Sequence, residues 1–219
     1  MAKMLFISGT GTDVGKTYFS GLLLKGMLEK GLNAGYYKPI VSGGLGDVES
    51  VLKVSGLKRE PEELNTYCFP EPVSPELAAR KRGLEFDFEK IKNKAENLAK
   101  EFDYLIIEGA GGLGCPLKVN SDEVLTYADF AKNLSLPTLL VAPAGLGCLS
   151  DCLAYKYMAE HHGINLLGFV LSRYNENDDI DRDNAEQLPL LTKLPILAKV
   201  LPNAKNVEFS ALLFAMGIK

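Results

Sequence analysis

The sequence has no excess of positive charge. Its 219 residues include 24 lysines and arginines against 28 aspartates and glutamates, which gives a formal net charge of −4 at pH 7. Proteins that bind nucleic acid or anionic membranes usually carry a basic surface, because their partners are negatively charged. This balance argues against nucleic acid and membrane as partners, and it favours small molecules or other proteins.

Long apolar runs are also missing. The first run, Met4–Ile7, is too short for the hydrophobic region of a signal peptide, and no small-residue cleavage site follows it. No other run approaches the roughly 20 apolar residues that a membrane-spanning helix needs. We therefore expect a cytoplasmic protein.

Cysteine and histidine are scarce. The 4 cysteines contain no C-x-x-C pair, and in a chain with a full hydrophobic core they need not form disulfides. Cys148 and Cys152 would share one face of a helix, but two thiols alone do not complete a tetrahedral zinc site. His161 and His162 fall at the expected end of a helix, where imidazole interacts favourably with the helix dipole. We assign the histidines no catalytic role.

The sequence does contain a regular alternation of apolar runs and helical stretches. With 219 residues, of which 47% are hydrophobic, the chain is long and apolar enough to bury one substantial core. It contains no internal repeat and no low-complexity segment. Runs that are apolar on both faces, each followed by a glycine-containing turn and a helix, are typical of βαβ units. We predict an α/β fold: one domain over residues 1–219, with three layers and a mainly parallel central sheet.

The pattern places individual elements. The predicted strands are Lys3–Ser8, Ala34–Lys38, Tyr104–Glu108, Thr138–Ala142, Leu166–Ser172 and Ile196–Val200. The predicted helices are Lys16–Lys30, Phe88–Phe102, Leu125–Leu134, Leu149–His162 and Val207–Met216.

Two segments lie outside this pattern. The proline-rich stretch Pro61–Pro75 is expected to be a structured connection rather than an interdomain linker, because the α/β pattern continues on both sides. The acidic segment Asp178–Asp183 starts like a calcium loop but lacks the later glycine and glutamate that such a loop needs. We expect a solvated acidic loop there.

A glycine-rich segment joins the first predicted strand to the first predicted helix. It reads Gly9-Thr10-Gly11-Thr12-Asp13-Val14-Gly15-Lys16-Thr17. Glycines allow several backbone N–H groups to point at one anion, and the helix N-terminus adds partial positive charge. Lys16 would then reach the outer phosphates of a nucleoside triphosphate, and the Thr17 hydroxyl would bind Mg²⁺. The spacing departs from G-x-x-x-x-G-K-[ST], because Thr10 stands five residues before Gly15.

A carboxylate stands at the end of another predicted strand. Glu108 ends the apolar run that starts at Tyr104, and the residues after it are Gly109, Ala110, Gly111 and Gly112. A phosphate loop needs a carboxylate that holds the metal and its waters, and the end of a neighbouring strand is the place for it. Glu108 is therefore a candidate metal ligand, with the capping of a turn as its alternative role.

Taken together, these motifs resemble the dethiobiotin synthetase family. The resemblance spans the whole chain and rests on the phosphate loop, the Glu108–Gly112 turn, and the segments Gly35–Gly43, Phe69–Pro75 and Gly145–Cys148. It implies a P-loop NTPase-like fold and a cyclo-ligase of biotin biosynthesis, which forms carbon–nitrogen bonds. The implied reaction converts 7,8-diaminononanoate, CO₂ and ATP into dethiobiotin, ADP and phosphate. An amine captures CO₂ as a carbamate, the γ-phosphoryl group is transferred to it, and the second amine closes the ring.

The resemblance also implies roles for individual residues. Lys16, Lys38 and Mg²⁺ would bring together the anionic carbamate and phosphoryl group, with Thr12 near the carbamate. Mg²⁺ would be held by Thr17, Glu108 and a second carboxylate, Asp47, with Glu49 as its competitor. The nucleotide would contact a larger set: Asp13, Val14, Gly15, Lys16, Thr17, Tyr18, Asp47, Glu108, Gly109, Ala110, Gly111, Ser172, Leu201, Pro202, Asn203 and Glu208.

The substrate site is implied in the same way. Its residues would be Ser42, Thr12, Gly147, Cys148 and Ser150, and the free N–H groups of the Gly145–Cys148 segment would bind the far carboxylate of the substrate. In the family this surface belongs to the partner subunit, so a homodimer is implied. Two positions depart from the family: Ser150 stands where some relatives have Asn, and Ser172 with Arg173 stands where an adenine-reading Asn is expected. The preferred base of the nucleotide stays open.

Two other functions of P-loop proteins are alternatives to the carboxylating enzyme. A cobyrinic acid amidotransferase would need a glutaminase domain with a nucleophilic cysteine and a partner histidine, for which this chain is too short. A partitioning-type P-loop switch ATPase would have an additional lysine early in the phosphate loop, whereas positions 10 to 14 are Thr, Gly, Thr, Asp and Val. The sequence favours the carboxylating enzyme over both rivals.

Overall fold

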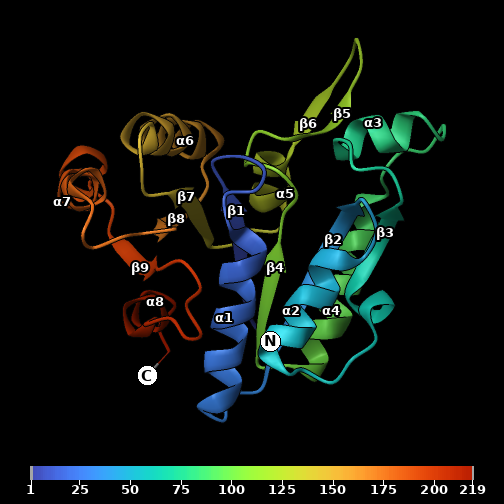
Figure 1. Ribbon diagram of the computed structural model, residues 1–219. Helices are drawn as coiled ribbons and strands as arrows, with labels where there is room; N and C mark the ends of the chain where they lie inside the picture. The colour runs from blue at the N-terminus through green and yellow to red at the C-terminus, as the bar shows by residue number, and fades with distance from the viewer. Residues whose placement is uncertain (1, 219) are drawn as a thin grey trace.

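Seven parallel strands form the central sheet of the protein (Figure 1). In the computed structural model, which describes residues 2–218, the strand order is β3-β2-β4-β1-β7-β8-β9. All neighbouring strands in it are parallel. The strands are β1 (Lys3–Gly9), β2 (Ala34–Ser42), β3 (Asn65–Phe69), β4 (Tyr104–Glu108), β7 (Thr138–Pro143), β8 (Leu166–Ser172) and β9 (Ile196–Val200).

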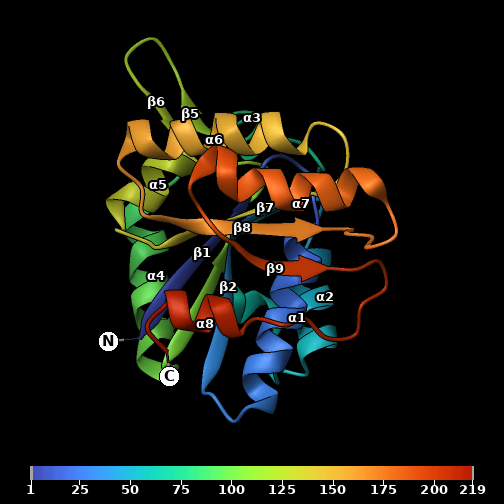
Figure 2. The same cartoon turned by 90° about the vertical axis from the view of Figure 1, so that its left-hand side faces the viewer.

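Helices cover both faces of this sheet. One face carries α1 (Lys16–Glu29), α2 (Gly46–Ser55) and α8 (Ser210–Ala215), and the other carries α4 (Phe88–Glu101), α5 (Tyr127–Asn133), α6 (Cys148–His162) and α7 (Asp179–Thr192). Figure 2 shows this layering at one end of the sheet, with α6 and α7 on one side of β8 and β9 and with α1 and α8 on the other. Within residues 2–218, no helix combines the length and the apolar character needed to cross a membrane.

Shorter elements complete the domain. A 3₁₀ helix, η1 (Pro61–Leu64), leads into β3, and α3 (Pro75–Arg80) follows that strand. The antiparallel strands β5 (Pro116–Val119) and β6 (Val124–Thr126) form a hairpin that projects above the sheet in Figure 1.

The core lies on both sides of the sheet because the strands are apolar on both faces. Leu5, Phe6 and Ile7 of β1 are all fully buried. The Phe6 ring packs against Tyr127 and Phe130 of α5, with ring centroids 5.9 and 5.6 Å apart. Parallel strands covered on both faces read as continuous hydrophobic runs, which is why the sequence placed them well.

The predicted strands and helices are all present, with shifted ends. β2 continues past Lys38 to Ser42, and the last predicted helix shortens to α8. The Pro61–Pro75 stretch is a structured connection, as expected, but it contains the edge strand β3, which the sequence did not reveal. The elements α2, α3, α7 and the β5–β6 hairpin were also missed, because they are short or have a polar exposed face.

The expectation of a solvated acidic loop at Asp178–Asp183 is wrong. The segment begins α7, and the Asp178 carboxylate accepts hydrogen bonds from the N–H groups of Ile180 and Asp181, at 2.9 and 3.2 Å. Asp181 is buried and accepts the N–H of Asn175 at 2.8 Å. The aspartates thus cap a helix and hold the preceding turn, as acidic residues at a helix N-terminus often do.

The strand register brings the carboxyl ends of β1 and β4 to the level of the middle of β2. Ile7 of β1 lies beside Glu108 of β4, and Tyr37 of β2 lies beside Ile107 of the same strand. Lys38 therefore reaches the level of Glu108, next to the start of the glycine-rich loop. Ligands of open parallel sheets bind at this carboxyl edge, where β1 lies between β4 and β7.

Candidate active site

The Gly9–Thr17 segment forms a tight loop between β1 and α1. A side chain at Gly9 would come within 2.6 Å of Val14 Cγ2, and Gly15 adopts a left-handed conformation with φ of 98°. Because Gly15 caps α1 without a side chain, the first N–H groups of the helix stay available to an anion. The loop has the geometry of a phosphate cradle.

The end of β8 supports this loop from outside. The Ser172 hydroxyl donates to Val14 O at 2.6 Å and approaches Ala142 O at 3.2 Å, while Arg173 Nη2 donates to Asp13 O at 2.6 Å. Ser172 is itself buried. The two residues that stand at the expected position of an adenine-reading Asn therefore bind the phosphate loop backbone, a role that sequence reasoning missed.

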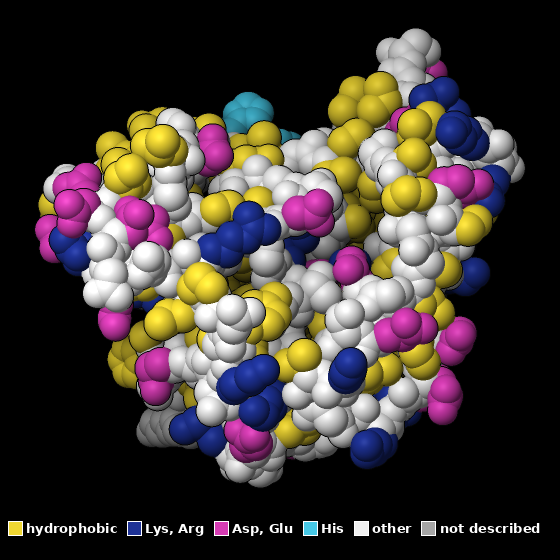
Figure 3. Space-filling model, in the orientation of Figure 1, with side chains coloured by type: hydrophobic (Ala, Val, Ile, Leu, Met, Phe, Trp, Pro, Cys, Tyr) yellow, Lys and Arg dark blue, Asp and Glu magenta, His cyan; other side chains and the backbone are white. Residues whose placement is uncertain are grey.

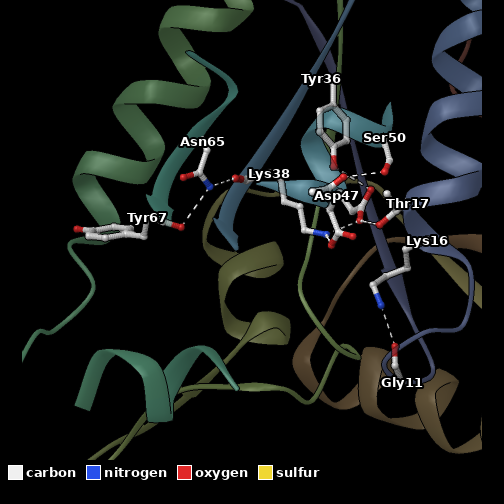
Figure 4. A network of polar contacts seen from close by, with 11 residues as sticks. Gly11, Lys16, Thr17, Tyr36, Lys38, Asp47, Ser50, Asn65 and Tyr67 are labelled. Carbon is white, nitrogen blue, oxygen red and sulfur yellow. Dashed lines mark hydrogen bonds and ion pairs between the residues drawn. The ribbon is translucent and has the colours of Figure 1, made fainter. Parts of the chain in front are cut away.

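Lys16 extends back across the loop. Its Nζ donates to Gly11 O at 2.8 Å, as Figure 4 shows, and only 7% of the residue is exposed. Burial is the largest influence on the Lys16 pKa and lowers it from the ordinary lysine value, against the attraction of Glu108. Lys16 lies where it can meet phosphates bound by the loop.

The Gly109–Gly112 turn lies against the same loop. Gly109 donates its N–H to Ile7 O at 3.0 Å, and Leu113 donates to Gly9 O at 3.2 Å. A Cβ at Gly111 would lie 3.1 Å from Cys115 Sγ and 3.9 Å from the hydroxyl of Thr12. The turn that follows Glu108, which includes Ala110, therefore lies near the exposed Thr12 of the phosphate loop.

Glu108 is the centre of a polar cluster behind the loop. Its side chain is 0% exposed, and its Oε1 accepts from the Thr17 hydroxyl and from Lys38 Nζ, each at 2.7 Å. Its Oε2 accepts from the Tyr36 hydroxyl at 3.0 Å. Lys38 also forms an ion pair with Asp47, and Figure 4 shows Thr17, Tyr36, Lys38 and Asp47 pointing toward one another. A buried carboxylate is tolerated only with such donors.

The surroundings of Lys38 and Tyr36 in this cluster keep both side chains protonated. Burial is the largest influence on the Lys38 pKa and lowers it, but Glu108 and Asp47 together outweigh burial, so the pKa is raised. Burial, and then the charge of Glu108, raise the pKa of Tyr36 well above that of free tyrosine. Lys38 therefore stays charged, and the Tyr36 phenol stays a hydrogen-bond donor.

Three oxygen-bearing side chains meet in this cluster. The Thr17 hydroxyl contacts Glu108, and the Asp47 carboxylate shares Lys38 with Glu108. Asp47 and Glu49 both lie in the first turn of α2 and are both exposed, but it is Asp47 that pairs with Lys38. Carboxylate and hydroxyl oxygens are the ligands that Mg²⁺ prefers, so this donor set fits a magnesium ion.

Four residues after β9 that are expected to contact the nucleotide fall into two groups. Leu201, Pro202 and Asn203 form an exposed turn after β9, and the Tyr18 hydroxyl of α1 donates to Ala204 O at the end of that turn. The structure thus ties this turn to the helix that follows the phosphate loop. The Glu208 carboxylate instead accepts the N–H of Ser210 at 2.7 Å, at the start of α8.

Apart from Thr12, the residues expected to bind the substrate lie at the end of β2 and at the start of α6. Ser42 ends β2, and its buried hydroxyl has no hydrogen-bond partner within residues 2–218. Gly147 precedes α6 with φ of 89°, Cys148 is buried in the first turn, and the Ser150 hydroxyl donates to Gly147 O at 3.0 Å. Figure 3 shows a hollow between α6 and the side formed by α3 and the hairpin.

The loop before α6 is shaped by a residue that sequence reasoning did not identify. Asn184 of α7 is buried, and its Nδ2 donates to Ala144 O and Gly145 O at 2.8 and 3.0 Å. A buried asparagine within a polar helix has no local sequence signal, since its partners lie far away in the chain.

The whole chain resembles curated proteins of one kind. A family model described as an AAA domain matches residues 3–210. The ATP-dependent dethiobiotin synthetase BioD of Brachyspira hyodysenteriae is 37% identical over 95% of this chain and 98% of its own length. That of Clostridium perfringens is 35% identical, over 95% of this chain and 94% of its own. The chain belongs to the dethiobiotin synthetase family. The family resemblance noted from the motifs is thereby confirmed.

Solved structures with low sequence identity share the fold of this member of the dethiobiotin synthetase family. The MinC:MinD cell division complex of Aquifex aeolicus matches with a TM-score of 0.60 and 13% identity, over 93% of this chain and 83% of the other. The septum site-determining protein MinD of Pyrococcus horikoshii, complexed with Mg-ADP, matches with a TM-score of 0.54 and 18% identity, over 92% and 82%. These likenesses confirm the predicted P-loop NTPase-like fold.

We expect Ser172→Ala to weaken nucleotide binding, because the loss of its hydroxyl frees the Val14 carbonyl and loosens the phosphate loop. One neutral hydrogen bond contributes about 0.5–1.5 kcal/mol, so the nucleotide Kd should rise about 2- to 10-fold. Calorimetric titration with ATP measures this change. Ser121→Ala, at the exposed hairpin tip, serves as control, and equal affinities of the two variants would refute the supporting role of Ser172.

Proposed function

We propose that this protein is a dethiobiotin synthetase that converts 7,8-diaminononanoate, CO₂ and ATP into dethiobiotin, ADP and phosphate. The observation that carries the proposal is the name shared by its relatives, ATP-dependent dethiobiotin synthetase, at 35 to 37% identity over nearly the whole of both chains. The phosphate loop, with Lys16 and Lys38 beside it, supports the same conclusion, because the reaction brings two anions together.

The residues around the loop would have different roles in phosphoryl transfer. The N–H groups at the start of α1 and the Lys16 ammonium would bind the β- and γ-phosphates. Mg²⁺, held by Thr17, Asp47 and Glu108, would supply further positive charge to the phosphates. Because these groups are fixed before substrate arrives, little reorganisation is needed as charge shifts during transfer.

Lys38 stands between the phosphate site and the proposed substrate site. It lies at the level of Glu108, in the middle of β2, and Ser42 ends the same strand. An amine of the substrate would attack CO₂, lose a proton and form a carbamate, which the charged Lys38 and Thr12 would hold. A carbamate oxygen then attacks the γ-phosphorus and ADP leaves. The second amine attacks the carbonyl carbon, and phosphate leaves as the ring closes.

A homodimer is part of this proposal. Leu146, in the loop before α6, is 89% exposed, and Val119 and Val124 on the hairpin are also exposed. Exposed apolar residues beside a site are typical of a subunit interface. The loop before α6 would then bring Gly147, Cys148 and Ser150 to the substrate of the other subunit.

A switch ATPase of the MinD kind is the rival from a different class. The likeness to MinD, at 13 and 18% identity, concerns the fold alone. The phosphate loop of this chain has no lysine before Lys16. The two functions differ in what ATP turnover requires.

A coupled assay with purified protein tests the proposal. It combines 7,8-diaminononanoate, bicarbonate and, in turn, ATP, GTP, CTP and UTP, and it measures dethiobiotin and released phosphate. We expect phosphate release only when both co-substrates are present, with one dethiobiotin per phosphate. Turnover of ATP without diaminononanoate and bicarbonate would instead support the switch ATPase, and the four nucleotides reveal the preferred base.

We expect Lys38→Ala to lower kcat by about 10²- to 10³-fold, the usual effect of removing one group that stabilises charge in the transition state. The ATP Kd should change far less, because the loop and Lys16 still hold the phosphates. Steady-state kinetics and calorimetric ATP titration separate the two effects. Lys53→Ala, an exposed lysine of α2, should match the wild type, and unchanged product formation by Lys38→Ala would refute its role.

We expect Leu146→Asp to raise the dimer dissociation constant by at least about tenfold, because burying a carboxylate in place of an apolar side chain costs more than about 1.4 kcal/mol. Sedimentation velocity over a range of concentrations measures the change. Leu190→Asp, an exposed leucine of α7, is the control. A monomeric wild type, or equal dissociation constants for both variants, would count against this interface.

A further inference from the structure

Tyr36 is a buried residue of β2 for which the reaction has so far required no role. Its side chain is fully buried, and its hydroxyl donates to Glu108 Oε2 at 3.0 Å. Figure 4 shows the phenol pointing into the cluster of Thr17, Lys38 and Asp47. The hydroxyl therefore contacts a residue of the proposed magnesium site, at the carboxylate oxygen that Thr17 does not contact.

The three donors to Glu108 are divided between its two oxygens. Thr17 and Lys38 both contact Oε1, whereas Tyr36 contacts Oε2. Tyr36 and Lys38 reach the same carboxylate because residues two apart on a strand point to the same face. Without the phenol, Oε2 would be a buried oxygen without a donor, and the carboxylate could rotate to satisfy it.

We propose that Tyr36 is a positioning residue of the metal site, which holds the Glu108 carboxylate so that Oε1 faces the Thr17 hydroxyl. Partners of this kind orient the ligands of protein-bound metals, and their removal usually costs about 10- to 100-fold in metal affinity or activity. This inference rests on the proposed function only for the presence of Mg²⁺ beside the bound nucleotide. It does not depend on which substrate accepts the phosphoryl group.

The neighbouring residue provides a matched control. Tyr37 is equally buried on the same strand but points to the opposite face, where its hydroxyl contacts the Thr66 hydroxyl at 2.5 Å and Ile91 O at 3.3 Å. Tyr37→Phe and Tyr36→Phe each remove one buried hydroxyl and keep the ring. They differ in whether the lost hydroxyl contacted Glu108.

The experiment measures how much Mg²⁺ strengthens ADP binding. Calorimetric titrations with ADP, in Mg²⁺ and then in EDTA, give this factor for the wild type and both variants, and thermal unfolding checks their folding. We expect Tyr36→Phe to lower the factor about tenfold or more, with the Kd in EDTA unchanged. Tyr37→Phe should keep the wild-type factor. An unchanged factor in Tyr36→Phe, or equal losses in both variants, would overturn the inference.

A double-mutant cycle tests whether Tyr36 acts through Glu108. Glu108→Gln should lower the Mg²⁺ factor by itself, and the addition of Tyr36→Phe should then have little further effect, since the carboxylate that the phenol orients is gone. Additive losses would overturn the inference. A wild type whose ADP binding does not respond to Mg²⁺ would overturn it too, while the coupled assay decides the proposed function separately.

Discussion

The buried carboxylate of Glu108 is the constraint on which the site depends. A charge without exposure to water is strongly destabilising unless donors surround it, and this one has three, from different parts of the chain. Thr17 belongs to α1, while Tyr36 and Lys38 belong to β2. Satisfying Glu108 therefore fixes α1 and β2 relative to β4. The same contacts leave Thr17 and Lys38 beside the phosphate loop, so the residue that stabilises this part of the fold also positions the side chains proposed to take part in the reaction.

The other half of the sheet supports the loops of the site. At the end of β8, Ser172 and Arg173 bind the backbone of the phosphate loop, and α7 holds the loop before α6 through Asn184. Loops at the carboxyl edge of a parallel sheet are irregular, so their backbone groups need partners from side chains. Ser172, Arg173 and Asn184 thus hold the backbone of the two loops at which nucleotide and substrate are proposed to bind.

The likeness to MinD shows how far a fold constrains function. Proteins with 13 to 18% identity share the fold of this chain, although one is part of a cell division protein complex and the other is a septum site-determining protein. The side chains of this chain that could support a specific reaction lie at the carboxyl edge, among them the cluster of Lys38, Asp47 and Glu108. Function therefore has to be argued from the site.

The sequence by itself determined the long buried strands, the phosphate loop and the position of Glu108, because apolar runs and glycine-lysine motifs are local signals. It missed β3 and the hairpin, which are short, and it misread the first turn of α7, whose aspartates look solvated until their partners are known. Only the tertiary structure paired Tyr36 with Glu108, 72 residues away, and Ser172 with Val14, 158 residues away. The physical reason is that periodicity reports whether a side chain is buried, whereas the partner of a buried polar group is decided by how distant strands pack together.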